Sequence, residues 1–253
     1  MVRYDVSAGV ATLTLDRPEK RNALNDATIA GLKEHLARAE HDAAVRVVLL
    51  RGAGNDFCAG ADLAQLEKIA AGGTPEENRA DAMQFGELLI QMRRMHKPIV
   101  AAVHGNALAG GAGLATACDI VIAHEDAVFG YPEVKIGFVP AMVMALLVRI
   151  VGESTAFELT AFGNTISAAE AHRLGLVNRV VTGDFAAHAV RYAQELAQRP
   201  ASAVQLIKQL LYDIDGMSFE QAIARAAEIN VIARGTEACR AGLAKFLSAR
   251  QSQ

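Results

Sequence analysis

The chain is poor in several residue types, and each shortage narrows what it can be. It has no tryptophan, an aromatic content of 5%, and three cysteines in 253 residues. Cys58, Cys118 and Cys239 are odd in number, lie far apart and follow no metal-ligand spacing, so we expect reduced core cysteines and no metal site. The longest apolar runs, such as residues 141–148, are too short to span a bilayer.

A strong charge of either sign is also lacking. The 25 basic and 28 acidic residues give a net charge of −3, which offers no electrostatic attraction for nucleic acid or an anionic membrane. The first residues, Met1 to Asp5, do not have the layout of a signal peptide, so we expect a cytoplasmic protein. What the chain does have is a hydrophobic content of 52%, ample for a buried core.

The order of the expected elements predicts an α/β core followed by helices. Strands are expected at residues 10–15, 45–51, 99–103 and 120–123, and helices at 26–41, 63–70 and 74–95. Thr74 and Glu77 form the pattern of a capping box around Pro75 at the start of the last of these helices. Beyond residue 141 helices dominate, at 141–151, 154–162, 168–174, 184–198, 202–214, 219–232 and 236–249, with a strand-like stretch at 176–181. We therefore divide the chain into a core domain, 1–190, and a C-terminal helical region, 191–253.

Two glycine-bearing segments, residues 57–63 and 107–114, carry the clearest chemical signal. Each follows an apolar strand and precedes a helix, so each presents backbone N–H groups at a helix start, a favourable place for negative charge. If the fold brings them together, they form an oxyanion hole. The alternatives are an ordinary connection with Asp62 as a helix cap, and close packing of a helix made of small residues. Gly111 and Gly113 also mimic a dinucleotide fingerprint, but its third glycine is missing.

A third segment, residues 129–137, places Glu133 in apolar and aromatic surroundings. Such surroundings raise the pKa of a carboxyl group and suit it to moving protons near neutral pH. The alternative is a loop glutamate that is solvated or paired with Lys135. His104 and His124 lie nearest these motifs, but a lone histidine is more often structural.

In this order the three segments resemble the crotonase superfamily, the enoyl-CoA hydratase/isomerase family. The resemblance covers nearly the whole chain, through residues 16–24, 166–171 and 175–177 to 242–250, where Phe246 stands in the closing helix. It implies a crotonase-like spiral of ββα units with a helical C-terminal trimerisation region. It also implies a homo-trimer or a dimer of trimers, and a place in fatty acid metabolism.

The resemblance implies a role for each motif. The N–H groups of Ala61 and Gly110 would stabilise the enolate of an acyl-CoA thioester, and Glu133 would be the catalytic acid/base. Coenzyme A, which belongs to the substrate and is no separate cofactor, would contact Lys20, Arg21, Ala23, Ala59, Asp62 and Leu63. Residues 71–78 and the helix behind them would shape the acyl pocket, whereas Met142 and Met144 fit the core better.

One position departs from the hydratase pattern. Gly113 stands where hydratases of the family have their first catalytic glutamate, three residues after the oxyanion glycine. A single carboxylate at Glu133 suits a double-bond isomerase, and hydration stays open if another group orients the water. A non-catalytic acyl-CoA-binding subunit is the alternative from a different functional class.

Overall fold

A six-stranded sheet forms the centre of the protein. The structure is a computed structural model that describes residues 1–251, apart from the side chains of Leu63, Ile69 and Gln251. The strand order is β1-β2-β3-β4-β6-β9, and every neighbouring pair except β1 and β2 is parallel. The strands are β1 (Val2–Ser7), β2 (Val10–Leu15), β3 (Val47–Gly52), β4 (Ile99–Val103), β6 (Ile120–His124) and β9 (Arg179–Val181).

Both faces of this sheet are covered, as the nearly continuous apolar strands predict. On one face, Val48 and Leu50 of β3 pack with the buried side chains of α1 (Asp26–His41) and α3 (Pro75–Arg94). On the other, Val47 and Leu49 pack with Ala189 of α7 (Phe185–Ala197). The sheet therefore separates two apolar cores, one on the side of α1 and α3 and one on the side of α7.

A second, three-stranded sheet lies beside the first. It consists of β5 (Asn106–Leu108), β7 (Val128–Gly130) and β8 (Thr165–Ser167). Three-residue strands are too short to show an alternating pattern, so the sequence did not predict them. The edge strand β1 was missed because it is mostly exposed. Two short helices flank the small sheet, α4 (Gly110–Thr116) after β5 and the 3₁₀-helix η2 (Pro132–Ile136) after β7.

The helix starts and breaks that depend on nearby residues lie where the sequence predicts them. Thr74 accepts a hydrogen bond from the Glu77 N–H and donates its own N–H to the Glu77 carboxylate, which confirms the capping box. The remaining helices of the core are α2 (Leu63–Ala71), α5 (Ala141–Phe162) and α6 (Ala168–Arg173). Within α5, Gly152 has non-helical angles (φ 77°, ψ 167°), and this break separates the two helices expected there.

The cysteines fit the expectation in two of three places. Cys58 and Cys118 are buried, and burial raises the pKa of Cys58 to about 12, so the thiol is protonated and inert. Cys239 is only half-buried, near the C-terminus of the chain, which corrects its assignment to the core. All three are free thiols.

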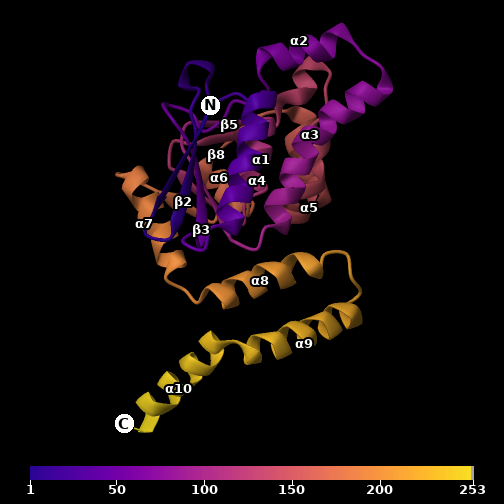
Figure 1. Cartoon of the computed structure of the whole chain (residues 1–253). Coiled ribbons are helices and arrows are strands. Elements are labelled where there is room, and N and C mark those ends of the chain that lie inside the picture. The colour runs from indigo at the N-terminus through magenta and orange to yellow at the C-terminus, as the bar shows by residue number, and fades with distance from the viewer. Residues whose placement is uncertain (252–253) are drawn as a thin grey trace.

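The C-terminal helices lie below the core in Figure 1, with the last one extending away from it. They are α8 (Ala201–Asp213), α9 (Phe219–Gly235) and α10 (Glu237–Gln251), which makes the expected mixed α/β fold with a helical C-terminal region correct. The expected division at residue 190 falls inside α7. No helix in the described part of the chain is long and apolar enough to cross a bilayer.

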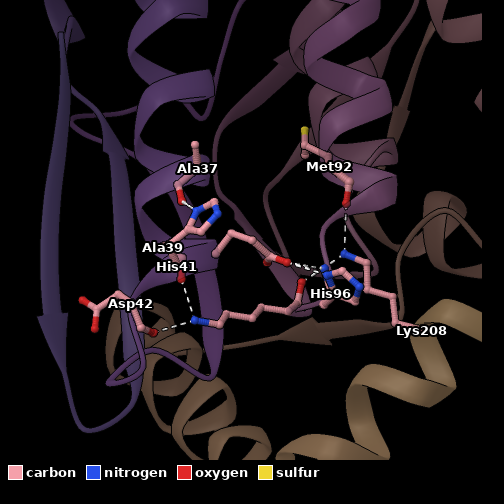
Figure 2. Close-up of polar contacts among 9 residues, drawn as sticks. Ala37, Ala39, His41, Asp42, Met92, His96 and Lys208 are labelled. Atoms are coloured by element: carbon pink, nitrogen blue, oxygen red, sulfur yellow. Dashed lines mark hydrogen bonds and ion pairs between the residues drawn. The ribbon is translucent and has the colours of Figure 1, made fainter.

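A buried lysine fastens α8 to the core. The Lys208 ammonium donates to the backbone carbonyls of Met92 and Lys97, each at 3.0 Å, and to the Asp119 carboxylate at 2.8 Å (Figure 2 shows the bond to Met92). Tyr212, one turn further along α8, donates to the other Asp119 oxygen at 2.7 Å. The end of α3 and the start of β6 are thereby joined to the same helix.

Lys97 makes a similar contact at the end of α1. Its ammonium donates to the carbonyls of Ala39 and Asp42, at 2.7 and 2.6 Å (Figure 2). The last carbonyls of a helix have no partner within it, so a buried cation there both satisfies them and opposes the negative end of the helix dipole. Burial lowers the pKa of Lys97, although the nearby Glu40 and Asp42 carboxylates oppose that shift.

The Lys208→Met variant should unfold more easily. Removing the cation leaves Asp119 buried without its counter-charge, a change that typically costs about 3–5 kcal/mol. Urea denaturation at a fixed protein concentration measures the loss. Lys245→Met, on the exposed α10, is the control and should change stability little. If both variants are as stable as the parent protein, the buried ion pair does not fasten α8.

Candidate active site

The two glycine-bearing segments lie side by side. Cys58 pairs with Ala107 as an isolated parallel bridge, with Cys58 N donating to Asn106 O and Leu108 N to Cys58 O, both at 3.0 Å. Gly60 has φ +96°, and a Cβ built there would lie 2.8 Å from the Ala109 Cβ and 3.5 Å from Gly110 N. Only glycine combines this dihedral angle with this close approach. The fold thus brings the Ala61 and Gly110 segments together.

Both predicted donor groups lack a backbone acceptor. Among the hydrogen bonds of the described residues, the N–H of Ala61 and that of Gly110 donate to no carbonyl. Gly110 is the first residue of α4, and Ala109 before it has φ 51° and ψ −125°, a conformation that L-residues avoid. Such strain costs roughly 1–3 kcal/mol and persists where the surroundings enforce it. Here the Ala109 N–H is held by the Gly130 carbonyl at 2.8 Å.

Residues 20–24 run alongside the segment at 57–63, and these two stretches together carry the residues expected to bind coenzyme A. Leu24 N donates to Gly60 O, and Asp62 N to Leu24 O, at 2.7 and 2.8 Å. Ala59 N donates to Arg21 O at 3.0 Å. Ala23 is buried and Lys20 is exposed. Leu63 begins α2, but its side chain lies outside the described residues.

Asp62 is engaged in structural contacts. One carboxylate oxygen accepts the Ala64 N–H at 3.1 Å, which confirms the expected cap of α2, and the other pairs with Arg17 at 2.7 Å. The hydrogen bond from Arg17 is the main reason that the pKa of Asp62 is lowered. An ionised, paired carboxylate is a poor second acid.

Arg21 is paired as well. Its Nε donates to Asp56 at 2.9 Å, and Asp56 also accepts the backbone and side-chain N–H groups of Asn106. Burial alone would raise the pKa of Asp56, but the hydrogen bonds from Arg21 and Asn106 outweigh it and lower the pKa. Asp56 thereby holds the loop before Phe57 against both Arg21 and the start of β5 at Asn106.

Glu133 differs from these carboxylates because one of its oxygens has no partner. It lies in η2, and its Oε2 is buried without any hydrogen bond. Among the ion pairs of the described residues, none joins it to Lys135, so the alternative of a paired loop glutamate does not apply. Burial raises the pKa of Glu133, with a hydrogen bond from its own N–H opposing the shift.

The backbone links Glu133 to the glycine segments. Gly130, three residues earlier, pairs with Leu108 in the small sheet and accepts the Ala109 N–H. Tyr131 between them is buried, and its hydroxyl lies 3.0 Å from the Thr116 hydroxyl of α4. Strand β7 therefore connects the start of α4 directly to the helical turn that carries Glu133.

The position of the missing carboxylate is filled by another side chain. A Cβ built at Gly113 would lie 2.3 Å from Cγ2 of Val143, a buried residue of α5. Real Cβ atoms essentially never come so close, so no side chain fits at residue 113 unless Val143 moves. The sequence showed the glycine but not its neighbour, because the contact joins two separate helices.

Apolar side chains border Gly110. A Cβ at Gly110 would lie 3.5 Å from Leu24 and 3.8 Å from Phe85 of α3. Phe85 carries no sequence motif, so it was missed, although the helix that carries it was expected to border the acyl pocket. Met142 packs against the core, in line with expectation.

The two histidines lie elsewhere. His104 and His124 flank Phe185 of α7, with ring centroids 6.4 and 5.7 Å from its own. They therefore belong to the α7 side of the main sheet, away from the cluster around Gly110. Among the described residues, no group of three or more His, Cys, Asp or Glu could hold a metal ion.

Comparison with known proteins places this arrangement among the acyl-CoA enzymes. The sequence model of the Enoyl-CoA hydratase/isomerase family matches residues 5–253. A Thermus thermophilus protein, named provisionally as an enoyl-CoA hydratase, is 42% identical over 95% of each chain. The 1,2-epoxyphenylacetyl-CoA isomerase of Escherichia coli is 34% identical, over 98% of this chain and 95% of its own. The 2,3-dehydroadipyl-CoA hydratase of the same organism is 33% identical, over 95% and 93%.

Solved structures show the same similarity in three dimensions. The enoyl-CoA hydratase of Mycobacterium smegmatis superposes with a TM-score of 0.92 at 32% identity, over 98% of this chain and 96% of its own. That of Polaromonas sp. JS666 gives a TM-score of 0.92 at 32% identity, over 98% and 97%. The spiral fold expected from the sequence is thus correct, and the chain belongs to the enoyl-CoA hydratase/isomerase family of acyl-CoA-processing enzymes.

Proposed function

We propose that the protein catalyses a double-bond shift in an enoyl-CoA thioester. The observation that carries this proposal is the combination of two neighbouring backbone donors without acceptors, at Ala61 and Gly110, with one partnerless carboxylate at Glu133. The donors would receive the thioester oxygen. Glu133 would remove a proton from the α carbon of a 3-enoyl-CoA and return it at the γ carbon, giving the 2-enoyl-CoA.

The physical properties of these groups suit such a reaction. Hydrogen-bond donors that are fixed before the reaction stabilise the charge that develops on the thioester oxygen, each by roughly 3–4 kcal/mol. Glu133 must both accept and release a proton, and a carboxyl group does so best when its pKa approaches the working pH. Burial moves the pKa of Glu133 in that direction.

The contact between Gly113 and Val143 favours isomerisation over hydration. In the hydratase pattern, a second carboxylate helps to hold and activate the water, and here Val143 fills its place. The relatives include both an isomerase and a hydratase at nearly the same identity, so their names do not decide between the two reactions. The choice rests on the packing of α4 against α5.

For coenzyme A we propose the segment beside the donors. Lys20 is exposed and has no ion-pair partner among the described residues, so it is available to a phosphate. Arg21 keeps its Nε on Asp56 and would offer its terminal nitrogens. The rest of the coenzyme A portion would lie against the backbone of Ala23, Ala59, Asp62 and Leu63.

We also propose that the protein assembles as a homo-trimer or a dimer of trimers through its C-terminal helices. Large apolar side chains are exposed there, at Phe219, Ile223, Val231, Ile232, Leu243, Phe246 and Leu247. Large apolar side chains exposed together on neighbouring helices are typical of an interface. A second copy of the chain is the occupant that the family resemblance implies.

Replacing the proposed base should abolish turnover but spare binding. Glu133→Gln should lower kcat for a 3-enoyl-CoA by about 100- to 10,000-fold, the usual contribution of general acid–base catalysis, with little change in the Kd of the thioester.

Because proton removal needs the carboxylate, the rate of the parent protein should fall as the pH drops through the raised pKa of Glu133. The acidic limb should thus lie above the range of an ordinary glutamate.

Lys135→Gln, on the exposed side of the same turn, is the control and should keep full activity. A panel of 3-enoyl- and 2-enoyl-CoA thioesters separates isomerisation from hydration. Full activity of Glu133→Gln would refute the base. Tight thioester binding by the parent protein with no turnover across the panel would instead favour a non-catalytic subunit.

The Gly113–Val143 contact can be tested by restoring the carboxylate. Gly113→Glu alone should be less stable, by about 1–3 kcal/mol for overpacking, and should not hydrate a 2-enoyl-CoA. Gly113→Glu combined with Val143→Ala removes the clashing Cγ2 atom and should gain hydration. Val143→Ala alone is the matched control and should gain none. Hydration by Gly113→Glu at parental stability would show that Val143 does not close the position.

Assembly can be tested by adding charge to the apolar helix face. Light scattering coupled to size exclusion should give a trimer or hexamer for the parent protein. Phe246→Glu and Leu243→Glu should shift it to smaller species, because a charge buried in an interface is strongly unfavourable. Lys245→Glu on the same helix is the control for charge alone. A parent protein that is monomeric at high concentration would refute the proposal.

A further inference from the structure

A cavity of about 670 Å³ lies on the α7 side of the main sheet, away from the site described above. Its floor consists of Leu49, Ala102 and Ala189, which belong to the apolar core under α7. Its walls carry polar groups from the ends of β2, β3 and β6. A volume of several hundred cubic ångströms is typical of pockets for small molecules.

The register of the sheet explains why two polar side chains, Thr14 and Arg51, lie beside the apolar floor of the cavity. Thr14 of β2 pairs with Arg51 of β3, and Arg51 pairs with Ala102 of β4. Since side chains alternate along a strand, Arg51 lies on the same face as Leu49, two residues earlier. Thr14 and Arg51 therefore lie at the carboxyl ends of parallel strands, where open α/β sheets bind their ligands.

Arg51 is a charged residue of the cavity wall, and its side chain has no counter-charge among the described residues. Its Nε donates to the buried Thr14 hydroxyl at 3.1 Å, and in the part of the chain that the structure describes its two terminal nitrogens have no acceptor. The other arginine on the cavity wall, Arg3, pairs with Asp16 at 3.0 Å. A half-buried guanidinium without an anionic partner is ready to bind an anion in bidentate fashion.

The groups that face Arg51 from the other elements are mainly neutral or basic. His104 contacts the Gly54 carbonyl at 2.9 Å through Nε2, and His124 lies 3.6 Å from Asp126. Asp126 is the carboxylate on the cavity wall, and its side chain is 86% exposed, so it screens the guanidinium poorly. The ring of Phe185, between the two histidines, adds an aromatic wall.

We propose that this cavity binds a small organic anion, with a phosphate or carboxylate head on Arg51 and an aromatic or apolar body over the floor. The terminal nitrogens of Arg51 would hold the head by two parallel hydrogen bonds. Phe185 and Leu49 would cover the body. The proposal does not depend on the reaction at Glu133, because the two places lie on opposite faces of the sheet.

Calorimetric titration of the full chain with phenyl phosphate and with benzoate tests the site, and phenol tests the need for charge. Both anions carry the same ring, so the tighter one identifies the preferred head group. Arg51→Gln should weaken binding by about tenfold or more, the usual effect of losing hydrogen bonds to a charged group. Arg51→Lys keeps the charge without the fork and should bind with intermediate affinity. Saturating coenzyme A should displace neither anion.

Arg46→Gln is the matched control, because Arg46 is exposed near the opposite end of β3. It should bind the anions like the parent protein. Arg51→Gln should keep its thermal unfolding temperature and any enoyl-CoA turnover of the parent, which separates a binding defect from misfolding. Three results would overturn the proposal: no saturable binding of either anion, equal binding by Arg51→Gln, or displacement by coenzyme A.

Discussion

The close approach of residues 58–61 to residues 107–110 is the constraint on which the candidate active site depends. It is made by the bridge between Cys58 and Ala107 and is possible because Gly60 has no side chain. The approach leaves two N–H groups without acceptors, a state that the protein tolerates only where a ligand or water can complete them. The same contact fixes the segment around Leu24, which pairs with Gly60 and Asp62. Three stretches of chain, far apart in the sequence, thereby form one surface.

The carboxylates around this surface differ in their hydrogen-bond partners. Asp56 and Asp62 accept hydrogen bonds from Arg21 and Arg17, and these bonds keep the pKa values of both carboxyl groups low. Glu133 has no such partner, so burial raises its pKa. The neighbouring arginines thus lower the pKa values of Asp56 and Asp62, whereas the pKa of Glu133 shifts the other way. The packing of Val143 against Gly113 leaves no room for a side chain at residue 113.

Features set by nearby residues could be predicted from the sequence, whereas features set by distant contacts could not. The capping box at Thr74 and the break in α5 near Gly152 follow from local rules. The two glycine segments were found because strand, loop and helix signals occur together within a few residues. The clash of Val143 with residue 113 and the proximity of Phe85 to Gly110 depend on how helices pack. Arg51 gave no signal either, since its missing counter-charge is visible only when the neighbouring strands are known.

The buried contact between Lys208 and Asp119 has a consequence for how the protein opens. Asp119 comes shortly after α4 and also accepts the N–H of Ile99 at the start of β4. If α8 detached alone, this carboxylate would lose its cation while still buried, so detachment is coupled to loosening of the sheet at the starts of β4 and β6. Amide groups in α8, in the end of α3 and at the starts of β4 and β6 should therefore exchange as one cooperative unit. Helix α8 is in this sense part of the folding unit of the core, although it lies below the core in Figure 1.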